Sequence, residues 1–306
     1  MSRRERKAQS AMEYLMTYGW AILIIAVVLG ALFQLGVFNA GTFAPKAPPG
    51  ACQVFRPNGP TSISNINLEG VCNGELPQYV GVFRTGQVGM TIPHTDALAV
   101  TGEIAVSFWF SSSYSSSAST PFDTQILTSR QPTDDTFDIQ ICGGESVLCG
   151  GTNGVVGGLH GDIGDGTGNW LTTGVNYQYS FGSATWQYVT LGFTTTSWTM
   201  YLNGAEVANG GYSGTPSLLD SNSYLIVGNG FLGDIANIQI YNASLSANEI
   251  QALYLEGIGG APIKLQNLVG WWPLNGNAND YSGNNNNGVP SGVTYTNQWT
   301  SGYTTP

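Results

Sequence analysis

Apolar and polar residues alternate in short runs from about residue 79 onward, and this alternation predicts β-strands. The run EIAVSFWF places four apolar side chains on one face: Ile104, Val106, Phe108 and Phe110. Further runs are WQYVTLGF at 186–193, YLIVG and DIANIQIY, separated by Gly, Ser and Asn clusters. In SWTMYLNGAEVA, Asn203-Gly204 predicts a hairpin, because both residues of a type I′ turn need positive φ. The pattern favours an antiparallel sandwich or jelly roll over a parallel sheet.

One helix interrupts the predicted strands, in the stretch SLSANEIQALYLEG. Ser246 and Glu249 have the spacing of a capping box, and Leu245 with Ile250 makes the matching hydrophobic staple. Gly257 is a suitable stop. We therefore expect a short helix that packs beside the sandwich through its apolar side chains, Ile250, Leu253 and Tyr254.

The N-terminal region has a different pattern. Residues 14–38 contain no charged side chain, and as a helix they would span about 37 Å, enough to cross a bilayer core. A secretory signal has a shorter apolar region. The basic residues before it predict a cytoplasmic N-terminus; they are Arg3, Arg4, Arg6 and Lys7. A proline-rich linker and a short lead-in follow at 41–78.

The order of residues around this apolar run resembles a known export signal. KAQSAMEYLM, with Gln9, Ser10, Glu13 and Tyr14, resembles the class III signal peptide of archaeal type IV pilins. The resemblance implies that a prepilin peptidase cuts between Ala8 and Gln9, so that 1–8 is a leader peptide. Residues 9–40 would then be a hydrophobic helix that waits in the membrane and later forms a filament core with other copies.

A carboxylate beside lipid is costly unless it is paired. Glu13 therefore has a predicted partner, the α-amino group that cleavage creates at Gln9 in the same or a neighbouring subunit. The alternative is a solvated Glu13 at the membrane interface of an ordinary anchor.

Residues 79–257 resemble a LamG-like (concanavalin A-like) jelly roll. The matching pieces are MTIPHTDALAVTGEIAVSFWF, ATWQYVTLGF, WTMYLNGAEVANG and FLGDIANIQIYNASLSANEIQALY. This implies an all-β jelly roll preceded by a long hydrophobic helix. Family members often hold Ca²⁺, but Ala236 and Asn237 stand where the family usually has two acids.

The tail, residues 258–306, resembles the segment that opens a LamG-like domain, through LVGWWPLNGNANDYSGNNNNGV. About 40 residues cannot easily bury a core of their own. We expect the tail to complete the jelly roll of its own chain; donation to the next subunit and a truncated second domain are the alternatives. If the tail completes the domain, oxygens would converge as calcium ligands from Asn237, Asn275, Asn277 and Asp280. A solvated Asn/Gly loop is the alternative reading, and Asp162 with Asp165 in HGDIGDG is a second candidate that also suits a turn.

Composition narrows the function. The 306 residues carry a formal charge of −10, and removal of 1–8 would leave 5 basic and 18 acidic residues, a charge of −13. Such a surface repels phosphate backbones, so nucleic-acid binding is not expected. We find no catalytic triad motif, metalloprotease motif or P-loop. EIAVSFWF and DIANIQIY also lack the paired acids of glycoside hydrolases, so we do not expect an enzyme.

Four cysteines and two histidines give little support to a zinc site. Outside the cell the cysteines predict two disulfides, with sequence order favouring Cys52–Cys72 and Cys142–Cys149; four buried thiols are the alternative. Asn242 is in the sequon Asn-Ala-Ser and is a candidate for glycosylation.

Carbohydrate binding would use exposed aromatic rings. The candidates are Trp109, Trp170, Trp186, Trp198, Trp271 and Trp272. The sequence thus predicts a subunit of an extracellular type IV pilus-like filament, whose LamG-like domain binds a carbohydrate or protein for adhesion. The alternative is a membrane-anchored, lectin-like surface protein that does not polymerise.

Overall fold

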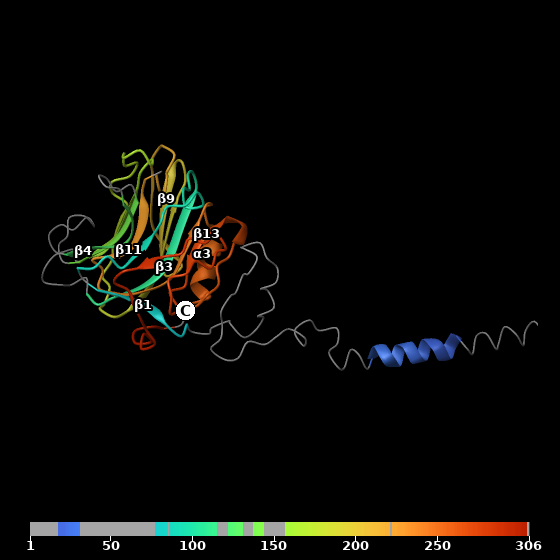
Figure 1. The fold of residues 1–306 in the computed structure, drawn as a ribbon. Coiled ribbons are helices and arrows are strands. Elements are labelled where there is room, and N and C mark those ends of the chain that lie inside the picture. The colour runs from blue at the N-terminus through green and yellow to red at the C-terminus, as the bar shows by residue number, and fades with distance from the viewer. Residues whose placement is uncertain are drawn as a thin grey trace, which may run out of the picture. The chain divides into compact units, whose positions relative to one another are not determined.

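The computed structural model describes residues 18–30, 77–84, 86–114, 122–130, 137–143, 157–220, 222–304 and 306 (Figure 1). The chain divides into two compact units. The first comprises Met1–Lys46 and Ile66–Glu69, and the second comprises Ala47–Asn65 and Gly70–Pro306.

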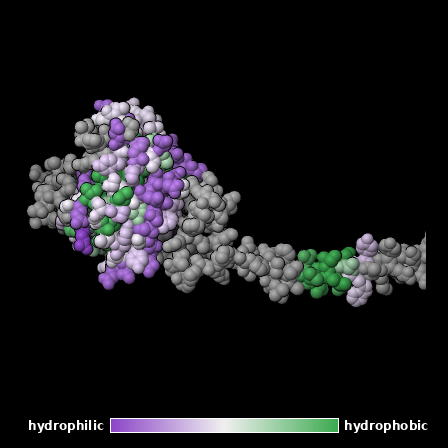
Figure 2. All heavy atoms as spheres, in the orientation of Figure 1, coloured by the Kyte–Doolittle hydropathy of each residue, from purple (hydrophilic) through white to green (hydrophobic). Residues whose placement is uncertain are grey.

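In the first unit, residues 18–30 form an α-helix. Its large apolar side chains are exposed along the whole segment, and Trp20 is 66% exposed. Figure 2 shows the greater part of this segment in the green of hydrophobic residues, with pale purple atoms at one end. Within the described ranges, no helix combines the length and apolarity needed to cross a membrane. The rest of the predicted helix 9–40, including Glu13 and Tyr14, lies outside them.

The second unit is a sandwich of two antiparallel sheets, as the alternation predicts. Sheet A has the order β10-β9-β8-β3-β12-β1-β15, with β13 also paired to β12. Its strands are β1 (Val80–Phe83), β3 (Ile104–Ser112), β8 (Trp186–Phe193), β9 (Ser197–Leu202), β10 (Ala205–Gly211), β12 (Gly233–Tyr241), β13 (Leu268–Trp272) and β15 (Thr294–Thr296).

Sheet B has the order β14-β2-β11-β4-β5-β6-β7. Its strands are β2 (Met90–Ile92), β4 (Phe122–Arg130), β5 (Phe137–Gly143), β6 (Gly158–Ile163), β7 (Asn176–Gln178), β11 (Tyr224–Asn229) and β14 (Val289–Pro290).

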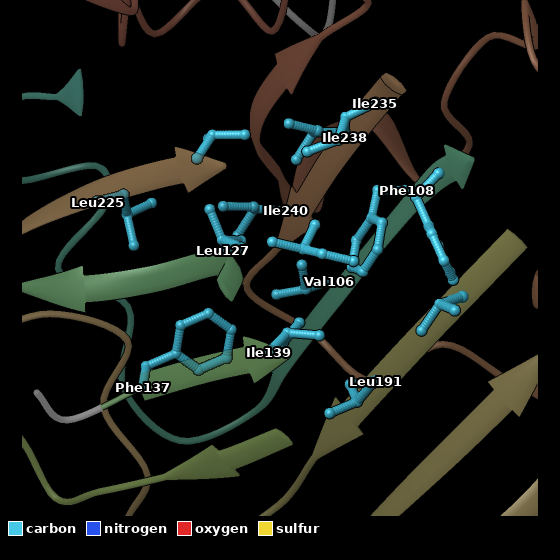
Figure 3. Packing of buried hydrophobic residues seen from close by; sticks show 14 of the residues in the cluster. Val106, Phe108, Leu127, Phe137, Ile139, Leu191, Leu225, Ile235, Ile238 and Ile240 are labelled. Carbon is cyan, nitrogen blue, oxygen red and sulfur yellow. The ribbon is translucent and has the colours of Figure 1, made fainter. Parts of the chain in front are cut away.

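The main core lies between the sheets. The four apolar side chains predicted to share one face of β3 all belong to this core. They meet side chains from sheet B such as Leu127, Phe137 and Ile139 (Figure 3). Burial of this apolar surface is the main stabilising term for the sandwich. Since alternate residues of each strand point into this core, the remaining ones form the outer faces of the two sheets.

The predicted hairpin and helix are both present. Asn203 and Gly204 join β9 to β10 with φ values of 49° and 79°, as a type I′ turn requires. The helix is α3 (Ala247–Leu255), with the full capping box between Ser246 and Glu249. Gly257 follows the helix with φ of 78°.

Helix α3 covers a second apolar layer on the outer face of sheet A. Ile250 and Leu253 are buried there among aromatic side chains of the sheet. The ring of Tyr254 stacks on Trp109 with centroids 5.7 Å apart. The short 3₁₀ turn η2 (Leu265–Asn267) then leads into β13.

The tail adds strands to both sheets of its own chain. β13 pairs with β12, from Ile238 opposite Trp272 to Tyr241 opposite Leu268. β14 pairs with β2 at the border of sheet B, and β15 pairs with β1 at the border of sheet A. The segment therefore closes one side of the sandwich.

A candidate ligand-binding face on sheet B

The outer face of sheet B carries a line of polar side chains that we call the polar row. Each member lies opposite the next in the strand register, in the order Asn229, Gln125, Gln140, His160 and Asn176. The row crosses β11, β4, β5, β6 and β7, and four strand spacings give it a length of about 19 Å. An amide or imidazole at each step offers both donors and acceptors of hydrogen bonds.

Alternation with the core explains why the members of the row on β5 and β6 face outward. On β5, the side chains of Phe137, Ile139 and Ile141 belong to the core. Asp138 and Gln140 therefore point to the opposite side of the sheet. On β6, Leu159 and Ile163 enter the core in the same way, so His160 and Asp162 face outward beside them.

The row is held by direct contacts. Asn229 Nδ2 donates to Gln125 Oε1, and Gln140 Nε2 donates to Asp138 Oδ2. His160 Nδ1 lies 2.6 Å from Asn176 Oδ1. Gln125, Asn176 and Asn229 are half-buried, whereas Gln140 and His160 keep only 8% and 6% of their surface exposed. The ends of the row thus offer more surface than its middle.

Two carboxylates flank His160. Its Nε2 lies 3.3 Å from Asp162 Oδ2 and 3.7 Å from Asp138 Oδ1. Asp138 Oδ1 also accepts from the Asp162 amide at 3.2 Å, and Asp162 Oδ1 accepts from the Val175 amide at 3.2 Å. Burial raises the pKa of Asp138, while the neighbouring His160 and its hydrogen bonds act in the opposite direction. The two ring nitrogens of His160 therefore face oxygen atoms on both sides, from Asn176 and from the two carboxylates.

Exposed aromatic rings are scarce among the predicted tryptophans. Trp109, Trp186, Trp271 and Trp272 are buried, and Trp198 is half-buried against the core. Trp170 is 39% exposed in the loop between β6 and β7. Tyr224 is 37% exposed on β11, and because Leu225 points into the core, Tyr224 shares the outer face of sheet B with the polar row.

The four predicted calcium ligands are engaged by the protein itself. Asn275 Oδ1 accepts from the Tyr79 amide at 2.7 Å, and Asn277 Oδ1 accepts from the Asn279 amide at 2.9 Å. Asn237 Oδ1 accepts from Trp271 Nε1 at 2.7 Å and from Gln239 Nε2 at 3.0 Å. These donors direct positive charge at the oxygens where a cation would have to lie.

Asp280 is the most heavily used of the four. Its Oδ1 accepts from the amides of Trp271 and Ser282, and its Oδ2 accepts from the Ser282 hydroxyl and the Asn286 amide, all at 2.8–2.9 Å. The carboxylate thus organises the Asn-rich loop against β13. In the described part of the chain, no group of three or more His, Cys, Asp or Glu residues is placed to hold a metal ion. Calcium binding at the four residues stays a prediction.

The second calcium candidate, HGDIGDG, divides into two features. Asp162 belongs to the His160 cluster, whereas Asp165 closes a turn. Asp165 Oδ1 accepts from the amide and hydroxyl of Thr167, and Oδ2 accepts from Asn169 Nδ2. The hydrogen bonds from Thr167, which are the largest cause, lower the pKa of Asp165.

Other predicted sites have separate outcomes. Cys142 is disulfide-bonded, but Cys52, Cys72 and Cys149 lie outside the described residues, so neither predicted pairing is tested. Ala8, Gln9 and Glu13 also lie outside them. Asn242 is exposed, and the hydroxyl of Ser244 in its sequon donates to Glu103 Oε2 at 2.8 Å. Glycosylation there stays a prediction.

Neighbouring carboxylates occur on strands other than EIAVSFWF and DIANIQIY. They lie in FDIQIC and GLHGDI, on β5 and β6, and face outward. The signal was present as Asp-x-Gln and His-x-Asp alternating with apolar residues. What the sequence lacked was the register that sets Asp138 opposite Asp162 and Gln140 opposite His160.

Comparison with known proteins agrees with this architecture. Residues 84–251, more than half of the chain, match the Laminin_G_3 family model, described as the concanavalin A-like lectin/glucanases superfamily. No curated protein sequence matches the chain significantly.

Among solved structures, similar folds include a putative carbohydrate binding protein from Bacteroides ovatus (14% identity, 72% of this chain and 60% of that one, TM-score 0.48). A SAP-like pentraxin from Limulus polyphemus has 8% identity over 61% of this chain and 85% of that one, with a TM-score of 0.44. Domain 4 of the extracellular arabinanase AbnA from Geobacillus stearothermophilus, in complex with arabinotriose, has 18% identity over 56% and 74%, with a TM-score of 0.36.

Proposed function

We propose, on the premise that the chain belongs to the concanavalin A-like lectin/glucanases superfamily, that its sandwich binds a carbohydrate on the outer face of sheet B. The polar row is the observation that carries this proposal. Sugars present many hydroxyl groups that each donate and accept, and a line of amides on a rigid sheet matches that chemistry. Tyr224 supplies an exposed ring on the same face for contact with an apolar sugar surface.

The site is proposed as a binding site rather than a catalytic one. Asp138 and Asp162 are both committed to backbone amides and to His160. A glycoside hydrolase instead needs one carboxyl group free to protonate the leaving oxygen and a second free to act on the sugar or on water. The contacts on sheet B therefore favour recognition without hydrolysis.

We further propose that the domain is presented on an extracellular filament resembling a type IV pilus. The order of basic run, Gln9, Glu13, Tyr14 and uncharged apolar run supports this. The exposed apolar side chains of residues 18–30 would be covered first by lipid and then by helices of other copies. A membrane-anchored lectin that never polymerises is the second candidate, because the same helix would serve as an anchor.

The binding proposal is tested with the full chain in detergent on an array of neutral, amino and acidic oligosaccharides. We expect Gln125→Ala to weaken the strongest binding about fivefold or more, since one direct hydrogen bond is lost. Asn209→Ala is the matched control, because Asn209 is also a strand amide, bonded to Glu206 on β10 at the far border of sheet A. Equal weakening by both variants, or no glycan binding by the native chain, would contradict the proposal.

The filament proposal is tested separately by shearing filaments from cells and sequencing the N-termini of their subunits. We expect a mature peptide that begins at Gln9, and we expect Glu13→Ala to abolish filaments while the protein remains in the membrane fraction. A surface protein recovered only from membranes, with native Glu13, would favour the non-polymerising lectin.

A further inference from the structure

The segment with which the chain enters the sandwich, at residue 77, is bonded to the tail near Trp299. Trp299, which is 3% exposed, donates from Nε1 to the carbonyl of Pro77 at 3.1 Å. Its own carbonyl accepts from Trp186 Nε1 at 2.9 Å, and the two indole rings meet edge to face with centroids 6.0 Å apart. Pro77 is thus tied through Trp299 to β8 in the middle of sheet A.

The residues that follow Pro77 are also bonded to the tail. The Tyr79 amide donates to Asn275 Oδ1 at 2.7 Å. β15 then pairs with β1 along Val80, Gly81 and Val82, opposite Thr296, Tyr295 and Thr294. On its other side β1 pairs with β12. The residues at which the chain enters the sandwich are therefore held by the tail at almost every step from 77 to 82.

We propose that residues 275–299 form a mechanical clasp that protects the sandwich against tension arriving through residue 77. The inference rests on the proposed function in one respect: tension reaches residue 77 when the N-terminal helix is anchored and the sandwich holds a ligand.

The geometry of β1 supports this role. β1 pairs with β12 on one side and with β15 on the other, so a pull that extracts β1 through residue 77 has to break both ladders. Without the tail, β1 would be a four-residue border strand held on one side only. The indole of Trp299 adds a bond at the point where the force enters, before the first pair of the ladder.

The clasp also lies outside the part of the chain that matches the family model. Residues 77–83 precede the matched region 84–251, and residues 275–299 follow it. The strand and the tail segment that lie outside the matched region therefore interact with each other. If the tail served only to cover the border of sheet A, a hydrogen bond from its indole to Pro77 would not be needed.

The test is single-molecule pulling on the full chain, with one handle before the N-terminal helix and the other on Asn222, an exposed turn residue before β11. Trp299→Phe keeps a buried ring but removes the hydrogen bond to Pro77. We expect its unfolding rate at fixed force to rise roughly fivefold relative to the native chain.

Trp271→Phe is the matched control. Trp271 is 4% exposed and its indole also makes one buried hydrogen bond, to Asn237 Oδ1 at 2.7 Å, but that bond joins β12 to β13 rather than to β1. Both variants should lose similar thermal stability, and only W299F should lose resistance to force. Asn275→Ala, which removes the acceptor for the Tyr79 amide, gives a second reading if W299F does not fold.

The clasp proposal would be overturned if W299F and W271F raised the unfolding rate under force equally. It would also be overturned if W299F unfolded under force at the same rate as the native chain. Filament assembly does not enter this measurement. If W299F does not change force resistance but filaments form, only the clasp proposal fails. If W299F lowers force resistance but no filaments form, only the filament proposal fails.

Discussion

Asn237 Oδ1 accepts a 2.7 Å hydrogen bond from Trp271 Nε1, and this contact lies where β12 exchanges one neighbour for another. β12 pairs with β1 up to Ile235 and with β13 from Ile238 onward. Its ladder to β3 shifts register over the same residues, and Asn237 has a φ of 52°. Asn237 Nδ2 also donates to the Gly260 carbonyl at 2.8 Å. One buried side chain therefore joins the bulge, β13 and the segment that follows α3.

Asn237→Ala should destabilise the sandwich by about 3 kcal/mol, because it leaves buried donors without acceptors and places a Cβ-bearing residue without a local polar contact at positive φ. Urea denaturation with an unchanged m-value checks this. Asn237→Gly separates the two causes, since glycine tolerates the φ but makes none of the hydrogen bonds. A glycine variant as stable as the native chain would show that the hydrogen bonds contribute little.

Local sequence signals predicted the elements whose causes are local. Examples are the alternation in β3 and β8, the Asn203-Gly204 turn and the Ser246 cap. Each depends only on residues that are close to each other in the sequence. Asn237 was a different case. Its position in the family pattern suggested a calcium ligand, but its partners come from Trp271 and Gly260, far along the chain. The polar row was missed for the same reason, because only the register across five strands brings its members together.

Asp280→Asn should loosen the loop that covers the free side of β13. The carboxylate accepts from three backbone amides and one hydroxyl, and an amide group can no longer accept at both of its positions. We expect a loss of about 2 kcal/mol and faster hydrogen exchange at the Trp271 amide in particular. Exchange that accelerates equally throughout the sandwich would indicate global destabilisation instead.

The same variant tests the predicted calcium site. Since N–H donors occupy the oxygens of Asn275, Asn277 and Asp280, we expect millimolar Ca²⁺ and subsequent chelation to leave the Tm of the native chain unchanged. A ligand that binds only the folded state raises Tm by mass action. A calcium-dependent rise in Tm that is absent from D280N would place the ion in this loop.

Asp234 should make stability depend on pH in the acidic range. Burial raises the pKa of its carboxyl group from 3.8 to about 6. The unfolded chain then loses its proton first, so stability falls as pH rises from about 4 to 6 and stays level above. Asp234→Asn should remove this slope and raise stability at pH 7 by about 1 kcal/mol, discounted for the partial exposure of the side chain. Asp96→Asn, an exposed turn residue, is the control for removing one negative charge; an equal gain there would point to net charge instead.

His160→Gln should destabilise the outer face of sheet B more at neutral pH than at pH 3. Removal of the imidazole leaves Asp138 and Asp162 without the group between them, and it takes away an influence that lowers the pKa of Asp138. The folded-state pKa of Asp138 then rises further above its unfolded value. The loss of stability therefore grows as pH rises through that widened window and is largest at neutral pH.

Urea midpoints of the native chain and H160Q from pH 3 to 8 measure this difference. Adding Asp138→Asn to H160Q removes the carboxyl group whose pKa the imidazole lowers, so the double variant should lose the additional pH dependence seen in H160Q while keeping the loss of the imidazole contacts. A difference between H160Q and the native chain that is constant from pH 3 to 8 would mean that His160 acts by packing alone. The charges of Asp138 and Asp162 would then not depend on the imidazole for stabilisation. Other substitutions at His160 would leave the pH dependence of stability unchanged.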